Sequence, residues 1–496
     1  MQELRVPGLL LMENAGIGAY RVLRRRLGQH LQRPLLVGGT GQNGGDAWVV
    51  ARQLAAAGCA PRAVVLGDAE RIAGDAATNF AALAPLEVPV LHVASPVEVD
   101  RLVELLSWAT CVVDGVFGTG LDRPVTGLHA AAIAAMNRRG CKTLALDLPS
   151  GVDANSGAIQ GVAVRADCTA TFAAPKFGLS QYPARALCGV VDVCGIGVPP
   201  PTHSPAMWIE DEDLRGWLPP RAPDTHKGTA GHVIVFAGDT GTTGAALLSG
   251  RGALRGGAGL VTLAPRRRAQ AAVDAKVLEM MTVALPEHDI EACLSLAERA
   301  KTAVIGPGFG RDGAAKRLIA ALVRRLPIPA VVDADALSCV AEEGLALLAE
   351  ALAPRVLTPH PGEAARLLGV DTAEVQANRR AAALAMAQGS RQVVVLKGAG
   401  TLVAGTEGRL RVCDAGSPAM AVAGMGDVLT GLLASTLCQL PPLEAACAAV
   451  HWHARAGETW KTDRGLLASD LADRLPATLR QLGAGPDVSR MSSRTL

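Results

Sequence analysis

The chain has 496 residues, of which 49% are hydrophobic, 19% charged and 3% aromatic, and its formal net charge is +2. This length exceeds one ordinary hydrophobic core and predicts two to three domains, while the near-zero charge gives no support for binding nucleic acid or an acidic membrane. The 11 cysteines are scattered without a CxxC motif, which favours a reducing compartment over disulfides or a zinc site.

The first 200 residues alternate short apolar runs with helical stretches. We predict strands at 35–37, 63–66, 110–113 and 143–146, because each run is apolar and partly β-branched. Continuous apolar strands separated by helices indicate a parallel sheet that helices cover on both faces. The carboxyl ends of such strands form the ligand crevice in doubly wound sheets, so the residues after each strand are candidates for a site.

The segment after the first strand is rich in glycine and runs from Gly38 to Asp46, ahead of a predicted helix at 47–57. Glycines let backbone N–H groups approach an anion, and the helix amino terminus adds positive potential. Asn43 and Asp46 strengthen this signal, because a bare phosphate cradle does not need a carboxylate. Three later segments also place polar groups after apolar runs: Asp114–Leu121, Asp147–Gly151 and Thr171–Lys176. Four such clusters at one sheet edge indicate a site rather than independent turns.

A proline-rich break at 199–205 marks the clearest domain boundary. We therefore predict a first domain at 1–200, a second domain at 206–485 and a disordered tail at 486–496. The second half repeats the pattern of the first, with predicted strands at 232–236, 260–263, 303–305, 330–332, 355–357 and 392–396. The predicted fold class is α/β for both domains.

The last glycine motif of the second half places Gly424, Gly426 and Asp427 at the start of a long apolar stretch. We predict a buried helix whose amino terminus makes an anion hole for a transferring phosphoryl group. The adjacent Asp427 would accept a proton from the attacking hydroxyl. Taken alone, the same aspartate would also suit an ordinary helix N-cap.

Several other features have simple structural interpretations. The basic runs Arg24–Arg26 and Arg266–Arg268 are typical of solvated surface, and His451 and His453 are typical of packing or surface histidines rather than metal ligands. The apolar stretch 419–440 contains Asp427, and its charge-free parts are too short to span a membrane. No signal peptide is visible, so we expect a cytoplasmic protein without a membrane partner.

The motifs of the first domain resemble the NAD(P)H-hydrate epimerase family. LMENAG (11–16), QNGGD (42–46), DGVFGTGL (114–121), LDLPSGVDANSG (146–157) and TFAAPKFGL (171–179) occur in the order of that family. The resemblance implies a Rossmann-like, doubly wound domain that epimerises the C6 hydroxyl of hydrated NADH or NADPH. The family usually has Asn at the position of Gln42 and Gly at that of Ala47.

The same resemblance implies roles for individual residues. Asp147 would contact the nicotinamide as the acid–base group, and Lys176, one of eight lysines in the chain, would also be catalytic. Potassium would be held by Asn43, Asp114 and Ser150, since a hard cation suits oxygen ligands. The residues that line the substrate would be Gln42, Asn43, Gly44, Gly45, Asp46, Gly118, Thr119, Gly120, Leu121, Asp122, Arg123, Pro124 and Asp147.

The motifs of the second domain resemble ADP-dependent NAD(P)H-hydrate dehydratase, a branch of the ribokinase-like superfamily. They are HKG (226–228), GPGFG (306–310), TPHPGE (358–363), KGAGT (397–401) and GDVLTG (426–431). The resemblance implies a ribokinase-like α/β domain in which ADP, with Mg²⁺, phosphorylates the C6 hydroxyl and Asp427 is the base. The hydrated dinucleotide would contact Ala245, Gly308, His360 and Asp427. The nucleotide would contact Lys397, Gly398, Ala399, Gly400, Thr401 and Gly426, and the family usually has Thr at the position of Met425.

The two resemblances together imply a bifunctional repair enzyme. One domain would interconvert the R and S hydrates of NADH and NADPH, and the other would dehydrate the S epimer, releasing AMP and phosphate. The expected partners are these hydrates and ADP, in a homo-oligomer that binds no nucleic acid. The alternative is a ribokinase-type kinase of a small alcohol fused to a non-catalytic dinucleotide-binding module, against which the KGAGT and TPHPGE motifs argue.

Overall fold

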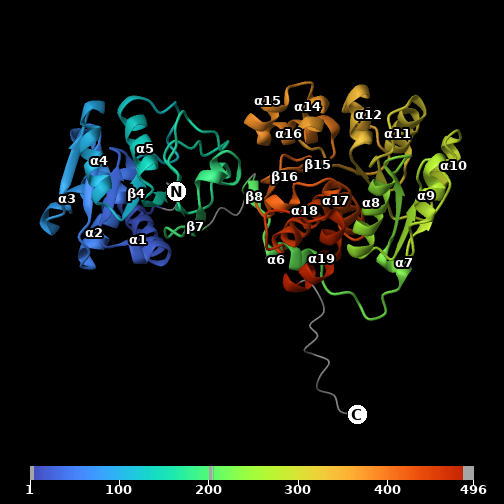
Figure 1. The fold of residues 1–496 in the computed structure, drawn as a ribbon, viewed down its shortest axis with the longest axis horizontal. Coiled ribbons are helices and arrows are strands. Elements are labelled where there is room, and N and C mark those ends of the chain that lie inside the picture. The colour runs from blue at the N-terminus through green and yellow to red at the C-terminus, as the bar shows by residue number, and fades with distance from the viewer. Residues whose placement is uncertain (1–4, 200–203, 205, 484–496) are drawn as a thin grey trace, which may run out of the picture. The chain divides into compact units, whose positions relative to one another are not determined.

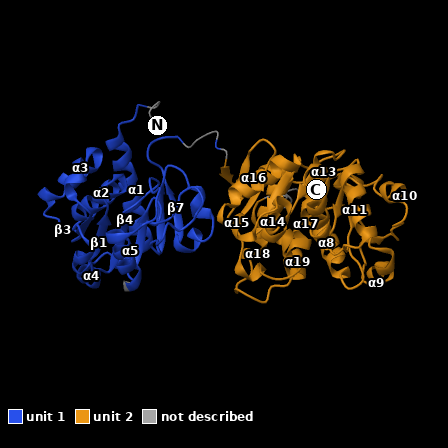
Figure 2. Cartoon of the chain, turned by 90° about the horizontal axis from the view of Figure 1, so that it is seen from above, with its two compact units in different colours: residues 1–204 blue, residues 205–496 orange. Residues whose placement is uncertain are grey.

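The computed structural model describes residues 5–199, 204 and 206–483, so the predicted tail at 486–496 lies outside the described residues. The chain divides into two compact units, residues 1–204 and 205–496 (Figures 1 and 2). Each unit is built on its own β-sheet with helices around it. Both units are therefore α/β, as the sequence predicts.

The first unit contains a seven-stranded sheet in the order β3-β2-β1-β4-β5-β6-β7, in which every neighbouring pair is parallel. The strands are β1 (Pro34–Gly38), β2 (Arg62–Leu66), β3 (Val90–Val93), β4 (Cys111–Gly115), β5 (Lys142–Leu146), β6 (Cys168–Phe172) and β7 (Val190–Cys194). The helices are α1 (Gly8–Leu27), α2 (Gln42–Ala56), α3 (Gly74–Ala81), α4 (Val99–Trp108) and α5 (Gly127–Arg139). This order extends the 3-2-1-4-5-6 arrangement of dinucleotide-binding folds, which confirms the Rossmann-like prediction.

Helices cover both faces of this sheet. Leu36 of β1 is buried on one face together with Leu23 of α1 and Trp48 of α2. Its neighbour Leu35 is buried on the other face together with Leu102 of α4. Successive strand residues point to opposite faces, so a strand that is buried on both must be apolar throughout.

The second unit contains a ten-stranded sheet in the order β11-β10-β9-β12-β13-β14-β15-β16-β17-β8. Its strands are β8 (Ala206–Trp208), β9 (His232–Phe236), β10 (Leu260–Leu263), β11 (Met281–Thr282), β12 (Thr302–Ile305), β13 (Ala330–Val332), β14 (Arg355–Leu357), β15 (Val393–Leu396), β16 (Thr401–Ala404) and β17 (Leu410–Cys413). Only the pairs β15–β16 and β16–β17 are antiparallel.

Fourteen helices belong to the described part of this unit. They are α6 (Asp211–Trp217), α7 (Lys227–Ala230), α8 (Thr243–Arg255), α9 (Gln270–Asp274), α10 (Ile290–Ser295), α11 (Gly313–Arg325), α12 (Asp335–Glu343), α13 (Ala346–Ala349), α14 (Pro361–Leu368), α15 (Thr372–Ala377), α16 (Arg379–Ser390), α17 (Met425–Leu437), α18 (Pro442–Glu458) and α19 (Ala468–Gln481). Helix α17 is buried along most of its length, as predicted. No helix in the described residues is long and apolar enough to cross a membrane.

All ten predicted strands are present, with ends within two residues of the predicted ones. The missed strands are β3, β6, β7, β8, β11, β16 and β17. Several of them lie at or near a sheet edge and are interrupted by a polar residue, as in Val190–Cys194 (VVDVC) of β7. Such strands lack the continuous apolar run on which the prediction relied.

The predicted start of the first-unit helix at Ala47 is wrong, because α2 begins at Gln42. The glycine-rich stretch forms the first turn of α2 rather than a loop before it. A Cβ atom at Gly44 would overlap the carbonyl oxygen of Gly39, and one at Gly45 would lie 2.6 Å from the Met12 sulfur. These glycines therefore allow α2 to start close against β1 and α1.

Candidate active sites at the two sheet edges

The predicted residues of the first unit gather where the strand order reverses. Strands β1 and β4 are neighbours in the sheet, and their connections leave toward opposite sides, which is the usual ligand position in such folds. Asn43 and Asp46 lie in the first turn of α2, after β1. Asp114 lies at the end of β4 and Asp147 directly follows β5.

Asn43, Asp114 and Ser150 form a compact cluster of oxygen atoms. The Asn43 amide nitrogen donates to the carbonyl oxygens of Phe117 (2.9 Å) and Leu146 (3.1 Å), which leaves its buried Oδ1 without a hydrogen-bond partner among the described residues. Asp114 is fully buried and accepts hydrogen bonds from the Ser150 backbone N–H (2.8 Å) and hydroxyl (2.6 Å). Burial raises the pKa of Asp114 to about 6 despite these bonds.

This cluster suits a cation held by oxygen atoms. The described residues contain no group of three or more His, Cys, Asp or Glu side chains that could hold a metal ion. An ion beside Asn43 would therefore depend on amide, hydroxyl and carbonyl oxygens together with one carboxylate. An unpartnered buried oxygen is costly, and a cation at this position would satisfy it.

Asp147 and Lys176 form a second pair at the same edge. Asp147 has a left-handed backbone, with φ of +64°, which is unfavourable for a residue with a side chain. Its carboxylate accepts hydrogen bonds from the Phe172 backbone N–H (3.2 Å) and from the Lys176 ammonium. The same ammonium donates to the carbonyl oxygen of Phe172 (2.7 Å). The structure thus brings together the two residues predicted to be catalytic in the first unit.

Asp46 is close enough to this pair for their charges to interact. It is 8% exposed, and its carboxyl group has no hydrogen bond to any described residue. Burial and, secondarily, the charge of Asp147 raise the pKa of Asp46 well above its usual range, against the lowering effect of Lys176. Asp46 thus places a second carboxyl group beside the Asp147–Lys176 pair.

The remaining predicted residues of the first site differ in exposure. Gln42 is exposed, whereas Gly44 and Gly45 are buried against the protein itself. The segment 118–124 lies between β4 and α5 and is largely exposed, and a Cβ atom at Gly118 would lie 3.4 Å from the Asn43 side chain. This segment thus borders the oxygen cluster.

In the second unit, two helices open at one sheet edge with their amino termini side by side. Helices α8 and α17 pack in parallel, as the close approaches of Gly424 to Leu248 and of Gly252 to Val428 show. A Cβ atom at Gly431 would overlap the carbonyl oxygen of Ser249, and one at Gly252 would overlap that of Val428. The glycines let the helices approach closely, so the positive ends of both helix dipoles face one region.

Asp427 lies in the first turn of α17, which follows the left-handed Gly424 (φ +88°). Its side chain has no hydrogen bond to any described residue. Burial, followed by the charge of Asp333, raises the pKa of Asp427 to about 6, and Lys397 lowers it. A partly buried carboxylate at a helix amino terminus, without a partner of its own, can accept a proton near neutral pH.

Lys397 lies beside the first turn of α17 between several carboxylates. Its ammonium is 2.8 Å from Asp333 and 3.9 Å from Glu363. Burial raises the pKa of Glu363 to about 7. Glu363 ends the TPHPGE motif and Asp333 directly follows the predicted strand at 330–332, but neither was assigned a role. Their positions after β13 and at the start of α14 are the signal that could have identified them.

The other predicted residues of the second site lie around this centre. His360 caps α14 by accepting hydrogen bonds from the N–H groups of Gly362 (3.0 Å) and Glu363 (3.3 Å). The segment 397–401 connects β15 to β16, and the buried Arg379 donates to the carbonyl oxygens of Leu396 (3.1 Å) and Lys397 (3.3 Å) at its start. Ala245 lies in the first turn of α8.

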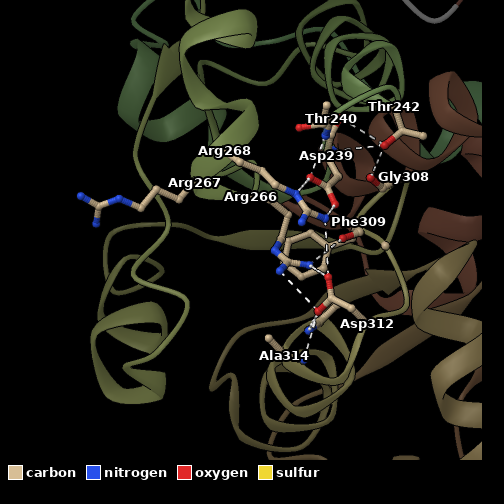
Figure 3. A network of polar contacts seen from close by, with 12 residues as sticks. Asp239, Thr240, Thr242, Arg266, Arg267, Arg268, Gly308, Phe309, Asp312 and Ala314 are labelled. Carbon is tan, nitrogen blue, oxygen red and sulfur yellow. Dashed lines mark hydrogen bonds and ion pairs between the residues drawn. The ribbon is translucent and has the colours of Figure 1, made fainter.

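Gly308 adjoins a network of charged residues that Figure 3 shows in detail. Thr242 donates to the carbonyl oxygen of Gly308 (2.7 Å), and the nearby Arg268 forms an ion pair with Asp239. Arg266 forms ion pairs with Glu287 (2.7 Å) and Asp312 (3.1 Å) and is only 4% exposed. The prediction that 266–268 is solvated surface is therefore wrong for Arg266, because remote carboxylates compensate its burial.

The two histidines of α18 are both buried. His451 lies 2.7 Å from Asp211, and His453 lies 3.1 Å from the Met425 carbonyl oxygen. Burial lowers the pKa of His453 to about 4, so this residue is neutral at physiological pH. Their contacts agree with the predicted packing role.

Comparisons with known proteins match both units. A family model described as NAD(P)H-hydrate dehydratase matches residues 233–480, and one described as YjeF-related protein N-terminus matches residues 8–178. The bifunctional NAD(P)H-hydrate repair enzyme of Moorella thermoacetica is 38% identical over 97% of this chain and 94% of its own length.

Solved structures resemble the second unit. The ADP/ATP-dependent NAD(P)H-hydrate dehydratase of Bacillus subtilis, co-crystallised with ATP and Mg²⁺, is 30% identical with a TM-score of 0.50, over 55% of this chain and 98% of its own. A ribokinase-like superfamily protein of Enterococcus faecalis, 23% identical with a TM-score of 0.50, covers 57% of this chain and 98% of its own. The latter shows the fold alone, which agrees with the predicted ribokinase-like domain.

Proposed function

The chain belongs to the bifunctional NAD(P)H-hydrate repair enzymes, and from this membership we propose which residues carry each of the two activities. The family carries NAD(P)H-hydrate epimerase and dehydratase activities, and so does this chain. We assign the epimerase to residues 1–200 and the dehydratase to residues 206–485. The alternative of a small-alcohol kinase fused to a non-catalytic module is not favoured, because full-length repair enzymes match both parts.

The observation that carries the dehydratase assignment is Asp427 at the paired amino termini of α8 and α17. Asp427 takes the proton of the C6 hydroxyl as that oxygen attacks the β-phosphorus of ADP, which enters as its magnesium complex, and AMP leaves. Lys397 and the N–H groups of the first turn of α17 stabilise the charge on the transferring group. The C6–O bond then breaks with loss of phosphate and of a proton from C5, which restores the dihydropyridine ring.

The other predicted ligand contacts of the second unit follow the same edge. Ala245, Gly308 and His360 would contact the hydrated dinucleotide, because Ala245 and His360 lie at the starts of α8 and α14 and Gly308 contacts Thr242 just before α8. The nucleotide would lie against the segment 397–401 and Gly426. The Bacillus subtilis enzyme bound to ATP and Mg²⁺ supports nucleotide and magnesium use by this fold.

In the first unit, Asp147 would transfer protons at C6, and Lys176 would hold its carboxylate in place. The contact between Lys176 and Asp147, together with the left-handed backbone of Asp147, supports this assignment. The substrate would lie over Gln42, Asp46 and the segment 118–124. These residues follow β1 and β4, the neighbouring strands at which the strand order reverses.

A potassium ion would be held by Asn43, Asp114 and Ser150. The unpartnered buried Oδ1 of Asn43 supports this assignment, as does the absence of sulfur and imidazole from the cluster. When bound, the ion supplies a fixed positive charge near the crevice. A homo-oligomeric state and a cytoplasmic location complete the proposal, and sedimentation and localisation of the tagged chain would test them.

The direct test of the function is the recovery of NADH absorbance from a mixture of hydrated epimers supplied with ADP or ATP and Mg²⁺. The wild-type protein should return the whole mixture to NADH. Recovery of only one epimer would remove the epimerase assignment. Formation of a stable phosphate ester without recovery of NADH would favour the kinase alternative.

A further inference from the structure

We propose that Asp333 is the positioning residue that holds Lys397 away from Asp427 and so keeps Asp427 free to accept the substrate proton. This inference rests on the dehydratase mechanism proposed above and adds to it a residue outside the predicted set. Asp333 follows β13 and is 2% exposed. It contacts neither the substrate nor the nucleotide in this account, and it acts through Lys397.

The carboxylate of Asp333 binds two different elements. One oxygen is 2.8 Å from the Lys397 ammonium at the end of β15, and the other accepts a hydrogen bond from the Thr430 hydroxyl (2.8 Å) on α17. Thr430 lies three residues after Asp427, so the two residues occupy neighbouring positions on the helix. Asp333 thus fixes Lys397 relative to the turn that carries the base.

The side chain of Lys397 has little room to move, because it is only 19% exposed. A Cβ atom at Gly426 would lie 3.5 Å from its ammonium, which places that charge against the first turn of α17. Lys397 therefore faces both Asp333 and Asp427 but hydrogen-bonds only the first. Without Asp333, the carboxylates that interact with Lys397 would be those of Glu363 and Asp427.

The backbone around Asp333 is held by contacts that do not involve its carboxylate. Its N–H donates to the carbonyl oxygen of Ile305 (3.1 Å), and its own carbonyl accepts from Ala336 (3.1 Å). The next residue, Ala334, has a left-handed φ of +51°. Replacement of the carboxylate by an amide of the same shape should therefore leave the loop in place.

The charges around Asp427 give the proposal a measurable signature. Burial raises the pKa of Asp427 most, the charge of Asp333 after β13 raises it further, and Lys397 after β15 lowers it. Farther out, Glu363 of α14 contacts Lys397, and the neutral His453 of α18 contacts the backbone of Met425. Removal of Asp333 deletes the raising charge and releases Lys397 toward Asp427, so both effects lower the pKa of the base.

The test compares Asp333→Asn, Lys397→Met and the double variant in the full-length chain, using the S hydrate with saturating ADP and Mg²⁺. In Asp333→Asn, the acid limb of the kcat/KM profile should move to lower pH by about one unit. Its kcat should fall about tenfold or more, with KM for the hydrate nearly unchanged. Lys397→Met should move the limb to higher pH, and the double variant should return it toward the wild-type position.

Asp167→Asn is the matched control, because Asp167 forms an Asp–Lys pair with Lys142 (2.6 Å) in the other unit. Its dehydratase profile should match that of the wild type. An unchanged limb and kcat in Asp333→Asn, or shifts of the same sign in both single variants, would overturn the positioning role. If Asp333→Asn does not fold, the acid limb of the kcat/KM profile of Lys397→Met is used instead. Movement of this limb to higher pH supports the proposal, and no movement overturns it. A wild-type protein without dehydratase activity would instead overturn the proposed function.

Discussion

Each sheet edge holds a lysine beside aspartates, but the two lysines are placed differently. In the first unit, Lys176 contacts Asp147, the residue assigned to the chemistry. In the second unit, Lys397 contacts Asp333, and Asp427, the assigned base, has no hydrogen bond to a described residue. An ion pair favours the charged form of a carboxylate, whereas burial without one favours the protonated form. The same residue types thus produce a held carboxylate in one unit and a free base in the other.

The two edges also differ in how they present positive charge. The second unit combines two helix amino termini, brought together by Gly252 and Gly431, with Lys397. In the first unit, the predicted site residues lie on the first turn of α2 and in a cluster of oxygens that suits a cation. A transferring phosphoryl group needs fixed donors around it, and the second edge supplies them. The predictions below test this contrast, from the largest expected effect to the smallest.

The largest effect is expected for Asp427→Asn in the dehydratase. Loss of a general base should cut kcat by about 10²–10⁴ while the hydrate and ADP still bind. Loss of a mere helix cap would instead cost about 1 kcal/mol of stability and leave kcat alone. Steady-state kinetics, with calorimetric binding and melting as controls, separates the two. Near-full activity of this variant would refute the assignment of the base.

The pH dependence of the wild-type dehydratase follows from the same residue. The pKa of Asp427 is raised to about 6 in the free protein, and the base must be deprotonated to work. The kcat/KM profile should therefore fall as the pH decreases through about 6 and stay level above it. The profile should be measured from about one pH unit below this pKa to about two units above it. A kcat/KM that does not change over this range would mean that another group is the base.

The lysine of the second unit should affect nucleotide use more than epimerisation. Lys397→Ala removes the cation between Asp333 and Glu363, so the phosphates of ADP meet uncompensated negative charge. We expect the KM for ADP to rise by about tenfold or more, with epimerisation unchanged. An unaltered KM for ADP would place the phosphate site elsewhere in the unit.

Much of this contrast could be predicted from the sequence, because strand ends and glycine motifs are local signals. Continuous apolar strands such as β9 and β13 were found with their observed ends, and Asp147 and Asp427 follow from their motifs. Edge strands such as β7 were missed because a polar residue interrupts their apolar run. The start of α2 was missed because Gly44 and Gly45 suggest a loop, while the contacts that require glycine there come from β1 and α1.

The partners of the site residues were harder to predict than the residues themselves. Asp333 and Lys397 are 64 positions apart, and only the sheet order brings the ends of β13 and β15 near each other. Arg266 was wrongly assigned to the surface for the same reason, since Glu287 and Asp312 reach it from other segments. A linear motif shows which side chain is present but not which charge compensates it.

A moderate effect is expected from potassium in the first unit. Potassium should slow hydrogen exchange of the segment 111–151, because the ion satisfies the Asn43 oxygen and the Asp114 carboxylate. This slowing of exchange by potassium should be absent in Asp114→Ala, and sodium serves as the control ion. Equal exchange in potassium, in sodium and without added salt would remove the metal assignment.

The smallest effect is expected for Met425→Thr. Residue 425 contributes its backbone to the first turn of α17, and its side chain is 7% exposed within the core. Because N–H groups make the anion hole, dehydratase activity should stay within about tenfold of the wild type. A larger change in kcat, in either direction, would show that the side chain at this position takes part in the chemistry.

The central claim is that two separate carboxylates, Asp147 and Asp427, serve two separate activities, and one assay tests it directly. A mixture of R and S hydrates is supplied with ADP and Mg²⁺, and NADH recovery is followed with Asp147→Asn, with Asp427→Asn and with both variants mixed. Asp147→Asn should recover only the S fraction, Asp427→Asn should recover essentially none, and the mixed variants should recover the whole. Loss of both activities in a well-folded Asp147→Asn, or no rescue on mixing, would contradict the division of function between the two units.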